Sequence, residues 1–119
     1  MGVRRESNRP NYSLEEAKRL AGDGKVMISR RPRWFITERV GRCDLKAFVS
    51  ELFDALEPED FYKSEELDVL PGTWADVYRP VPFLEPESGV SEDWYIKFYI
   101  EGGDVRLHVM SANYDGYIH

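Results

Sequence analysis

The segment from Asp60 to Pro80 reads DFYKSEELDVLPGTWADVYRP. It contains two basic residues, Lys63 and Arg79, and each of them directly follows a tyrosine. From residue 43 to the C-terminus the chain has 17 acidic residues and only 5 basic ones, so these two cations stand in acidic surroundings. A cation kept beside a phenol in such surroundings is suited to binding an anion. The alternative is that both side chains only neutralise nearby carboxylates, as many surface cations do.

Before this segment, the apolar residues recur with the spacing of an α-helix. The clearest helix begins after Asp44, a plausible N-cap, and ends at Pro58. Its apolar stripe consists of Leu45, Phe48, Val49, Leu52, Phe53 and Leu56. A shorter helix is predicted from Ser13, with Glu16 completing a capping box, to Gly22. Another is predicted from Arg30 to about Val40, with Pro32 in its first turn. We expect a brief strand over residues 25–29.

After Pro58 the pattern alternates, as it does in strands. Residues 61–64 and 73–78 are predicted strands separated by a loop over residues 65–72, and Pro80, Pro82 and Pro86 predict an irregular connection after them. Residues 94–101 and 104–110 form a predicted hairpin around a Gly102-Gly103 turn. The apolar residues of the hairpin share one face, which leaves on the other face Tyr95, Lys97, Tyr99, Arg106, His108 and Met110. Helices followed by a mostly antiparallel sheet define an α+β fold.

Length and composition predict one domain of 119 residues. Residues 1–11 are interpreted as a flexible basic arm and residues 12–119 as the domain itself. Cys43 is the only cysteine, which fits a reducing cytoplasm. It is interpreted as a buried structural residue. No apolar run approaches the length of a membrane span and no signal peptide is apparent, so we expect a cytoplasmic protein without a membrane partner.

The net charge of −6 is unevenly distributed. Residues 1–42 carry a balance of +6 and residues 43–119 a balance of −12. RNA could meet the basic part, including the arginines beside Trp34, and the acidic part offers a surface for a basic partner. The alternatives are that the asymmetry reflects solvation and a disordered arm, and that Trp34 packs in the core.

The motifs Asp60–Ser64, Pro71–Trp74 and Asp76–Pro80 together resemble the signature of the MqsR family. The resemblance extends more weakly to Trp94–Lys97 and to residues 103–105. Members of that family are toxins of type II toxin–antitoxin systems with a RelE/YoeB-like fold. They act as mRNA interferases. The resemblance therefore implies cleavage of mRNA and inhibition by a cognate antitoxin protein, with no cofactor and no metal.

RNA can be cut without a metal because its own 2′-OH can attack the neighbouring phosphorus. The resemblance implies that Lys63 stabilises charge on the phosphate and that Tyr95 transfers a proton or positions the substrate. Arg79 would hold the RNA backbone. Supporting substrate-binding residues are expected at Tyr62, Tyr78, Lys97, Tyr99 and Arg106.

The chain departs from the family pattern at two places. Ala75 stands where the family usually has Gln, and the last strand ends in Ser111-Ala112-Asn113 where a basic residue is expected. RNA affinity would then be lower or would depend on the arginines of the first part of the chain. An alternative function is a weakly active or inactive protein that binds RNA or a basic protein as a regulatory module.

Other chemistries have weaker signals. A proton-transfer pair of His108 and His119 is a minor alternative. The acidic runs 57–60 and 65–68 have no His or Cys at ligand spacing, so they are interpreted as solvated loops. A nucleophilic Cys43 has no histidine near it in the sequence.

Overall fold

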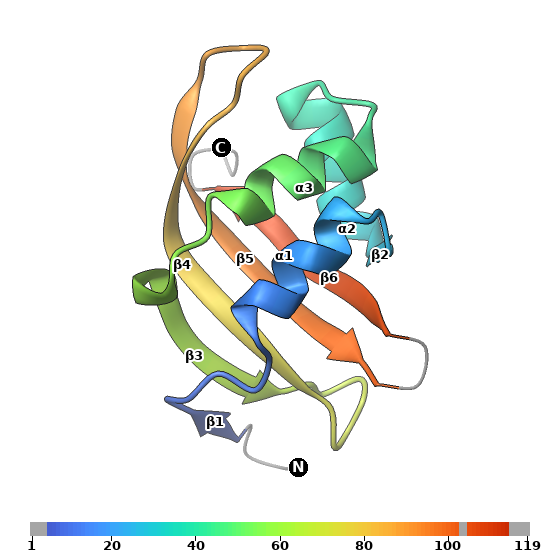
Figure 1. Ribbon diagram of the computed structural model, residues 1–119, viewed down its shortest axis with the longest axis vertical. Helices are drawn as coiled ribbons and strands as arrows, with labels where there is room; N and C mark the ends of the chain where they lie inside the picture. The colour runs from blue at the N-terminus through green and yellow to red at the C-terminus, as the bar shows by residue number, and fades with distance from the viewer. Residues whose placement is uncertain (1–4, 103–104, 115–119) are drawn as a thin grey trace.

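A six-stranded sheet with helices on one face makes up the computed structural model, which describes residues 5–102 and 105–114 (Figure 1). The helical elements are α1 (Leu14–Gly22), α2 (Arg30–Trp34), the π-helix η1 (Phe35–Val40), α3 (Leu45–Asp54) and the 3₁₀-helix η2 (Pro58–Asp60). The strands are β1 (Glu6–Ser7), β2 (Val26–Ile28), β3 (Phe61–Glu66), β4 (Trp74–Leu84), β5 (Ser91–Glu101) and β6 (Arg106–Tyr114). The strand order is β1-β3-β4-β5-β6-β2, and every pair is antiparallel except β2 with β6. The α+β prediction is confirmed.

The first and third predicted helices are present, but α3 ends at Asp54, before the predicted end at Pro58. The Ser13 hydroxyl accepts a hydrogen bond from the Glu16 N–H at 3.2 Å, as an N-cap does, and α1 ends at Gly22. The stripe of α3 is buried against the sheet, where Phe53 meets Phe98 edge-on at 5.3 Å between ring centroids. These contacts bury the helical face of the sheet.

The helix predicted from Arg30 to Val40 is confirmed, but it changes from α2 to the π-helix η1 after Trp34. Gly41 ends it with φ 87°, a conformation that glycine adopts without strain. Phe35 and Ile36 are buried, whereas Trp34 is 51% exposed. The alternative that Trp34 packs in the core is therefore wrong.

Strands β3 and β4 are longer than predicted. Strand β3 continues to Glu66, and β4 runs through Pro80 and Pro82 to Leu84. The pairing of β4 with β5 shifts between Tyr78 and Val81, so Pro80 lies in an irregular position that needs no N–H in the ladder. The expected irregular connection is thus a bulge within a strand.

The hairpin of β5 and β6 is present, with Glu101 opposite Arg106. The predicted turn falls at Gly102 and Gly103, and Gly103 lies outside the described residues. Strand β6 continues beyond the predicted end at residue 110 to Tyr114. A register shift near Lys97 lets it keep pairing with β5 as far as Trp94.

Residues 5–11, expected as part of a flexible arm, contribute to the fold. Strand β1 pairs with β3, placing Glu6 opposite Glu65. The backbone N–H groups of Asn11 and Tyr12 both donate to the carboxylate of Asp76, at 2.9–3.0 Å. A buried acceptor in β4 therefore ties the N-terminal segment to the sheet, which the local composition of that segment does not reveal.

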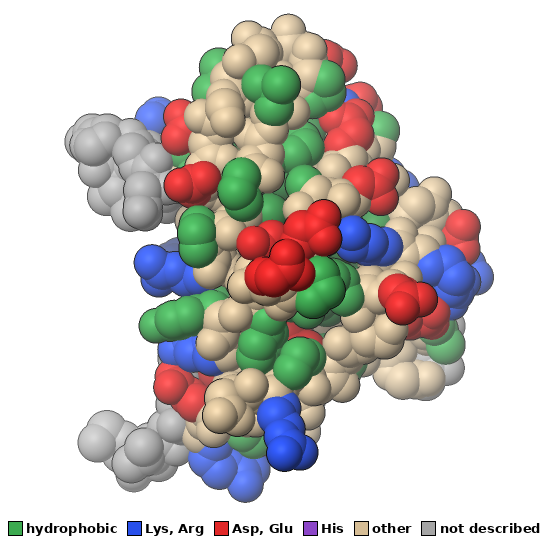
Figure 2. Space-filling model, turned by 60° about the vertical axis from the view of Figure 1, so that its left-hand side comes forward, with side chains coloured by type: hydrophobic (Ala, Val, Ile, Leu, Met, Phe, Trp, Pro, Cys, Tyr) green, Lys and Arg blue, Asp and Glu red, His purple; other side chains and the backbone are tan. Residues whose placement is uncertain are grey.

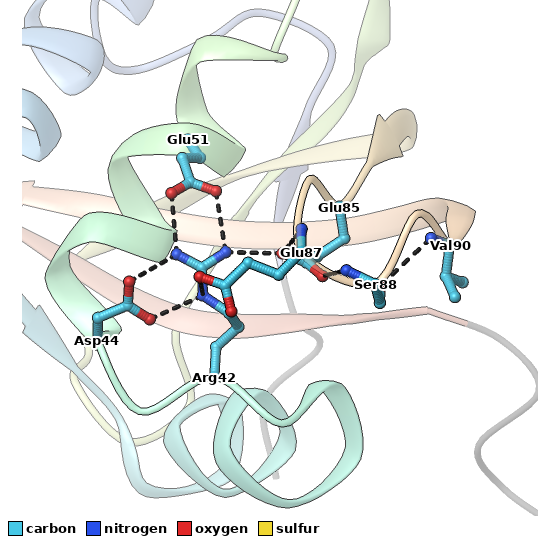
Figure 3. A network of polar contacts seen from close by, with 7 residues as sticks. All are labelled: Arg42, Asp44, Glu51, Glu85, Glu87, Ser88 and Val90. Carbon is cyan, nitrogen blue, oxygen red and sulfur yellow. Dashed lines mark hydrogen bonds and ion pairs between the residues drawn. The ribbon is translucent and has the colours of Figure 1, made fainter.

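A buried arginine, Arg42, joins the loop before α3, the helix α3 itself and the loop after β4 (Figure 3). Arg42 is 3% exposed and donates two hydrogen bonds each to Asp44 and Glu51, at 2.7–3.0 Å. Its Nη1 also donates to Glu85 at 2.7 Å. Glu85 accepts further hydrogen bonds from the backbone N–H groups of Glu87 and Ser88. The Asp44 carboxylate thus accepts hydrogen bonds from Arg42, and it does not cap α3 as predicted.

Among residues 5–102 and 105–114, no helix is long and apolar enough to cross a membrane.

Candidate functional site

The face of the sheet opposite the helices carries most of the predicted site residues. Lys63, Val77, Lys97 and Ser111 lie side by side across four strands. Because side chains alternate along each strand, Tyr95 and Tyr99 share this face with Lys97. We use the term open face for the surface formed by Tyr62, Lys63, Arg79, Tyr95, Lys97 and Tyr99.

Arg79 lies between two tyrosine rings of the open face. Its guanidinium carbon is 5.1 Å from the ring centre of Tyr62 and 6.0 Å from that of Tyr95. Arg79 is exposed, and Tyr62 is 53% exposed. The bulge in β3 after Phe61 and the shift in β4 after Tyr78 bring these residues together. The cluster combines a planar cation with two aromatic surfaces, which suits a phosphate and a base.

Two lysines of the open face share one buried carboxylate. Glu65 is 2% exposed, and its oxygens lie 3.2 Å from Lys63 Nζ and 2.9 Å from Lys97 Nζ. Burial alone would raise the pKa of Glu65, but the hydrogen bonds and charges of Lys97 and Lys63 outweigh it and hold this pKa below its ordinary value. Glu65 therefore fixes both ammonium groups in place.

The prediction of a solvated loop is wrong for Glu65, which belongs to β3. Its position two residues after Lys63 was the signal that alternation would put both on one face. The other acidic run is on the surface: Glu57 and Glu59 are exposed at η2. Figure 2 shows acidic side chains gathered near the middle of the side on which η2 lies.

Lys63 has a second partner in β1. Its ammonium donates to the carboxylate of Glu6 at 2.6 Å, and the side chain of Glu6 is 50% exposed. This hydrogen bond, together with Glu65, raises the pKa of Lys63, so the lysine is charged at neutral pH. An incoming phosphate can take the place of the exposed Glu6 carboxylate, whereas Glu65 is held beneath the surface.

The predicted substrate-binding residue Tyr78 is instead a core residue. It is 2% exposed and stacks on Phe98, with ring centroids 5.8 Å apart. Burial raises the pKa of its phenol to about 12. Tyr78 precedes Arg79 and so points to the helical face, where Ser64 and Asp76 also lie. A contact between Tyr78 and substrate is therefore not supported by its position.

The segment from Asp60 to Pro80, which carries the signature motifs, thus has two roles in the fold. Ser64 and Asp76 are fully buried polar residues that hold the N-terminal segment: the Asn11 side chain donates to Ser64 Oγ at 2.6 Å, and Asp76 accepts two backbone N–H groups. Burial raises the pKa of Asp76, although these hydrogen bonds favour its charged form. Lys63 and Arg79 point the other way.

Tyr99 and Arg106 lie toward the hairpin end of the open face. Tyr99 stacks on His108 with 4.5 Å between ring centroids, and His108 Nε2 is 2.7 Å from a Glu101 oxygen. Arg106 lies opposite Glu101 at the start of β6. His108, discounted from the sequence, therefore shares this face, next to a carboxylate that can orient its ring.

A hollow of about 200 Å³ borders Arg79 and Tyr95. Its lining also includes Pro80, Asp93, Trp94 and Asn113. Asn113 is opposite Tyr95 in the β5–β6 pairing, and its amide can both donate and accept hydrogen bonds. From the sequence, Asn113 was notable only as a departure from the family pattern at the end of the last strand.

Two further predictions concern Ala75 and Cys43. Ala75 is fully buried and pairs with Glu65, so its methyl group lies on the open face between β3 and β5. A longer side chain there would emerge beside the Glu65 carboxylate.

Cys43 is exposed, which contradicts its interpretation as a buried residue.

In the described part of the chain, no three His, Cys, Asp or Glu side chains are placed so that they could hold a metal ion together. Comparison with models of known protein families found no match, and comparison with curated proteins found none either.

Proposed function

We propose that this protein is a cytoplasmic endoribonuclease that cuts mRNA without a metal ion, and that a cognate antitoxin inhibits it. The observation that carries the proposal is the arrangement of Arg79 between Tyr62 and Tyr95, next to the paired lysines Lys63 and Lys97. The resemblance of the signature segment to MqsR toxins, with their RelE/YoeB-like fold, agrees with this arrangement.

The reaction in this proposal needs no metal ion. The 2′-OH of the RNA loses its proton and its oxygen forms a bond to phosphorus, while the bond from phosphorus to the 5′ oxygen breaks and that oxygen takes up a proton. Lys63 and Arg79 stabilise the negative charge that builds up on the phosphate oxygens. Tyr95 exchanges a proton with one of these two oxygens or positions it, and water carries the other proton. The products are a 2′,3′-cyclic phosphate and a 5′-OH.

The aromatic residues bind the substrate in this proposal. Tyr62 is exposed and can stack on a base, while Tyr99 and Lys97 extend the surface along β5. Single-stranded RNA suits such a flat surface because its bases are free to stack.

The acidic surface suits the antitoxin. The balance of −12 over residues 43–119 would attract a basic partner, and the acidic side chains near η2 are exposed. In this proposal the antitoxin meets that surface or covers the open face.

The test is cleavage of a defined mRNA by the purified protein in EDTA. We expect the wild type to cut and Lys63→Ala to lose about a hundredfold or more of the rate, since one stabilising group at a developing charge has that effect. Lys18→Ala removes an equal charge from α1 on the helical face and should cut as the wild type does. Cleavage that requires a metal, or that survives Lys63→Ala, would contradict the proposal.

A second candidate, a binding module without catalysis, is favoured by Ala75. Here the decisive variant is Ala75→Gln, which adds an amide beside Glu65 and the two lysines. Cleavage by this variant but not by the wild type would mean that the wild-type protein binds RNA without cutting it. Cleavage by neither folded protein would favour a protein-binding role.

A further inference from the structure

The outer edge of β6 is only half covered by a strand. Strand β2 pairs with Leu107, His108 and Val109, and after Ser29 the chain turns into α2. Within the described residues, β6 from Met110 onward therefore has β5 on one side, and α2 packs beside it on the other. This change from strand to helix leaves a hollow at the edge of the sheet.

The hollow has a volume of about 310 Å³ and is lined by Arg31, Pro32, Trp34, Phe35, Ser111 and Asn113. This volume is at the lower end of the range for small-ligand sites. Pro32 and Phe35 are buried and fix the position of the short helix, whereas Trp34 and Arg31 are exposed. A half-exposed indole at the rim of a hollow offers a flat ring face to a ligand.

Charge distinguishes this hollow from an ordinary apolar groove. Arg31 is an exposed guanidinium that makes no ion pair or hydrogen bond within the described part of the chain. In contrast, Arg42, Arg5 and Arg19 are all paired with carboxylates. An unpaired arginine beside an exposed tryptophan matches the two parts of a nucleotide, its phosphate and its base.

The hollow continues into the open face. Asn113 lines both this hollow and the one that borders Arg79 and Tyr95. Tyr95 and Asn113 are direct neighbours across β5 and β6. A chain held by Arg79 can therefore pass over Asn113 and reach Trp34.

We propose that Trp34, Arg31 and Asn113 form a nucleotide-binding subsite for single-stranded RNA, next to the position at which the RNA is cut. Trp34 stacks on a base, Arg31 binds the adjoining phosphate, and the Asn113 amide hydrogen-bonds the edge of the base. The subsite rests on the proposed function, because its ligand is a neighbouring nucleotide of the same RNA. Stacking accepts any base, so the sequence preference at this position depends on Asn113.

The first experiment measures binding without cleavage. The probe is a short, labelled 2′-O-methyl oligoribonucleotide of mixed sequence, which has no free 2′-OH to react. We expect its Kd, measured by fluorescence anisotropy, to rise about tenfold in Trp34→Ala, within the range for loss of one base–aromatic stack. Arg31→Ala should weaken binding less at high salt than at low salt. Arg19→Ala removes an arginine from α1 and should leave Kd unchanged.

A second measurement separates this inference from the proposed function. With cleavable RNA, Trp34→Ala should raise KM and leave kcat unchanged, since the subsite acts on binding alone. A wild type that binds the probe but cuts no RNA would overturn the nuclease proposal, and a weaker Kd of Trp34→Ala would then still support the subsite. A wild type that cuts RNA, together with an unchanged Kd and KM in a folded Trp34→Ala, would overturn the subsite. Circular dichroism establishes that each variant is folded.

Discussion

At the scale of single residues, two glutamates pair with the lysines of the open face, and they differ in their exposure to solvent. Glu65 is buried and shared by Lys63 and Lys97, whereas Glu6 is half exposed and contacts Lys63. A phosphate that binds Lys63 must displace Glu6 but not Glu65. In the proposed function, the two carboxylates therefore affect RNA binding differently, although they contact the same lysine.

This difference predicts that Glu6→Gln binds RNA more tightly than the wild type. The loss of one exposed competing charge should lower Kd by up to about fivefold, because exposed ion pairs contribute little energy. Anisotropy with the uncleavable RNA probe measures the change. Glu15→Gln alters an exposed carboxylate of α1 and serves as the control. Equal affinities of Glu6→Gln and the wild type would mean that Lys63 does not meet the RNA.

The residues also show what a sequence pattern can predict. Alternation correctly grouped Tyr95, Lys97 and Tyr99, because all three lie on one regular strand. It failed for Tyr78, which was grouped with Arg79 by adjacency although neighbours in a strand point to opposite faces. The pairing of Lys63 and Lys97 through Glu65 depends on contacts between strands 32 residues apart in the chain.

At the scale of elements, the Arg42 network links the start of α3 to the connection between β4 and β5 (Figure 3). Burial would raise the pKa of Glu85, but hydrogen bonds from Ser88, the Glu87 backbone and Arg42 lower it to about 2. The network has a structural role and takes no part in the open face. It holds α3 and the hairpin of β4 and β5 together. It was not predicted, because Glu51 and Glu85 lie 9 and 43 residues from Arg42 in the sequence.

We predict that Arg42→Met lowers the free energy of unfolding by about 3 kcal/mol, since it leaves the buried Glu85 without its cation. Chemical denaturation at neutral pH measures this loss. Arg19→Met breaks exposed pairs with Glu16 and Asp23 and should cost less than about 1 kcal/mol. Similar losses in both variants would contradict a structural role for the network.

The same network predicts the pH dependence of stability. Glu85 has a lower pKa in the folded chain than its ordinary value of 4.5, so its contribution is present above pH 4.5 and is lost as the pH falls toward about 2. In Glu85→Gln this part of the pH dependence should disappear.

The elements themselves were predicted where a cap or the periodicity is strong: the Ser13 cap in α1 and the apolar stripe in α3. Strand ends were less predictable. The prolines of β4 suggested a loop, but a register shift accommodates Pro80 and the strand continues. Strand β1 was missed because its two residues owe their position to Asp76 and β3, which lie far along the chain.

At the scale of the whole molecule, the helices cover one face of the sheet (Figure 1), and the opposite face carries the three cations Lys63, Arg79 and Lys97. This separation explains how a chain with a net charge of −6 can offer a local site for RNA. The acidic residues near η2 occupy a different side from the open face. Binding should therefore depend on a few cations and not on a broad basic surface.

A weak salt dependence follows from this distribution. With phosphate contacts at Lys63, Arg79 and Arg31, the logarithm of the binding constant should fall with the logarithm of salt concentration with a slope of roughly −2. Titrations with the uncleavable RNA at several salt concentrations measure the slope. A much steeper slope would indicate that RNA meets many more cations than the open face and the Trp34 subsite provide.

In the proposed function, the open face lets the RNA 2′-OH attack its own phosphate without a metal ion. The most direct test is mass spectrometry of the ends produced when the purified protein cuts a defined RNA in EDTA. We predict 2′,3′-cyclic phosphate and 5′-OH ends, and no cut where a single 2′-deoxy nucleotide replaces the one before the cut. Ends with a 5′-phosphate, or continued cutting at the 2′-deoxy position, would contradict the account.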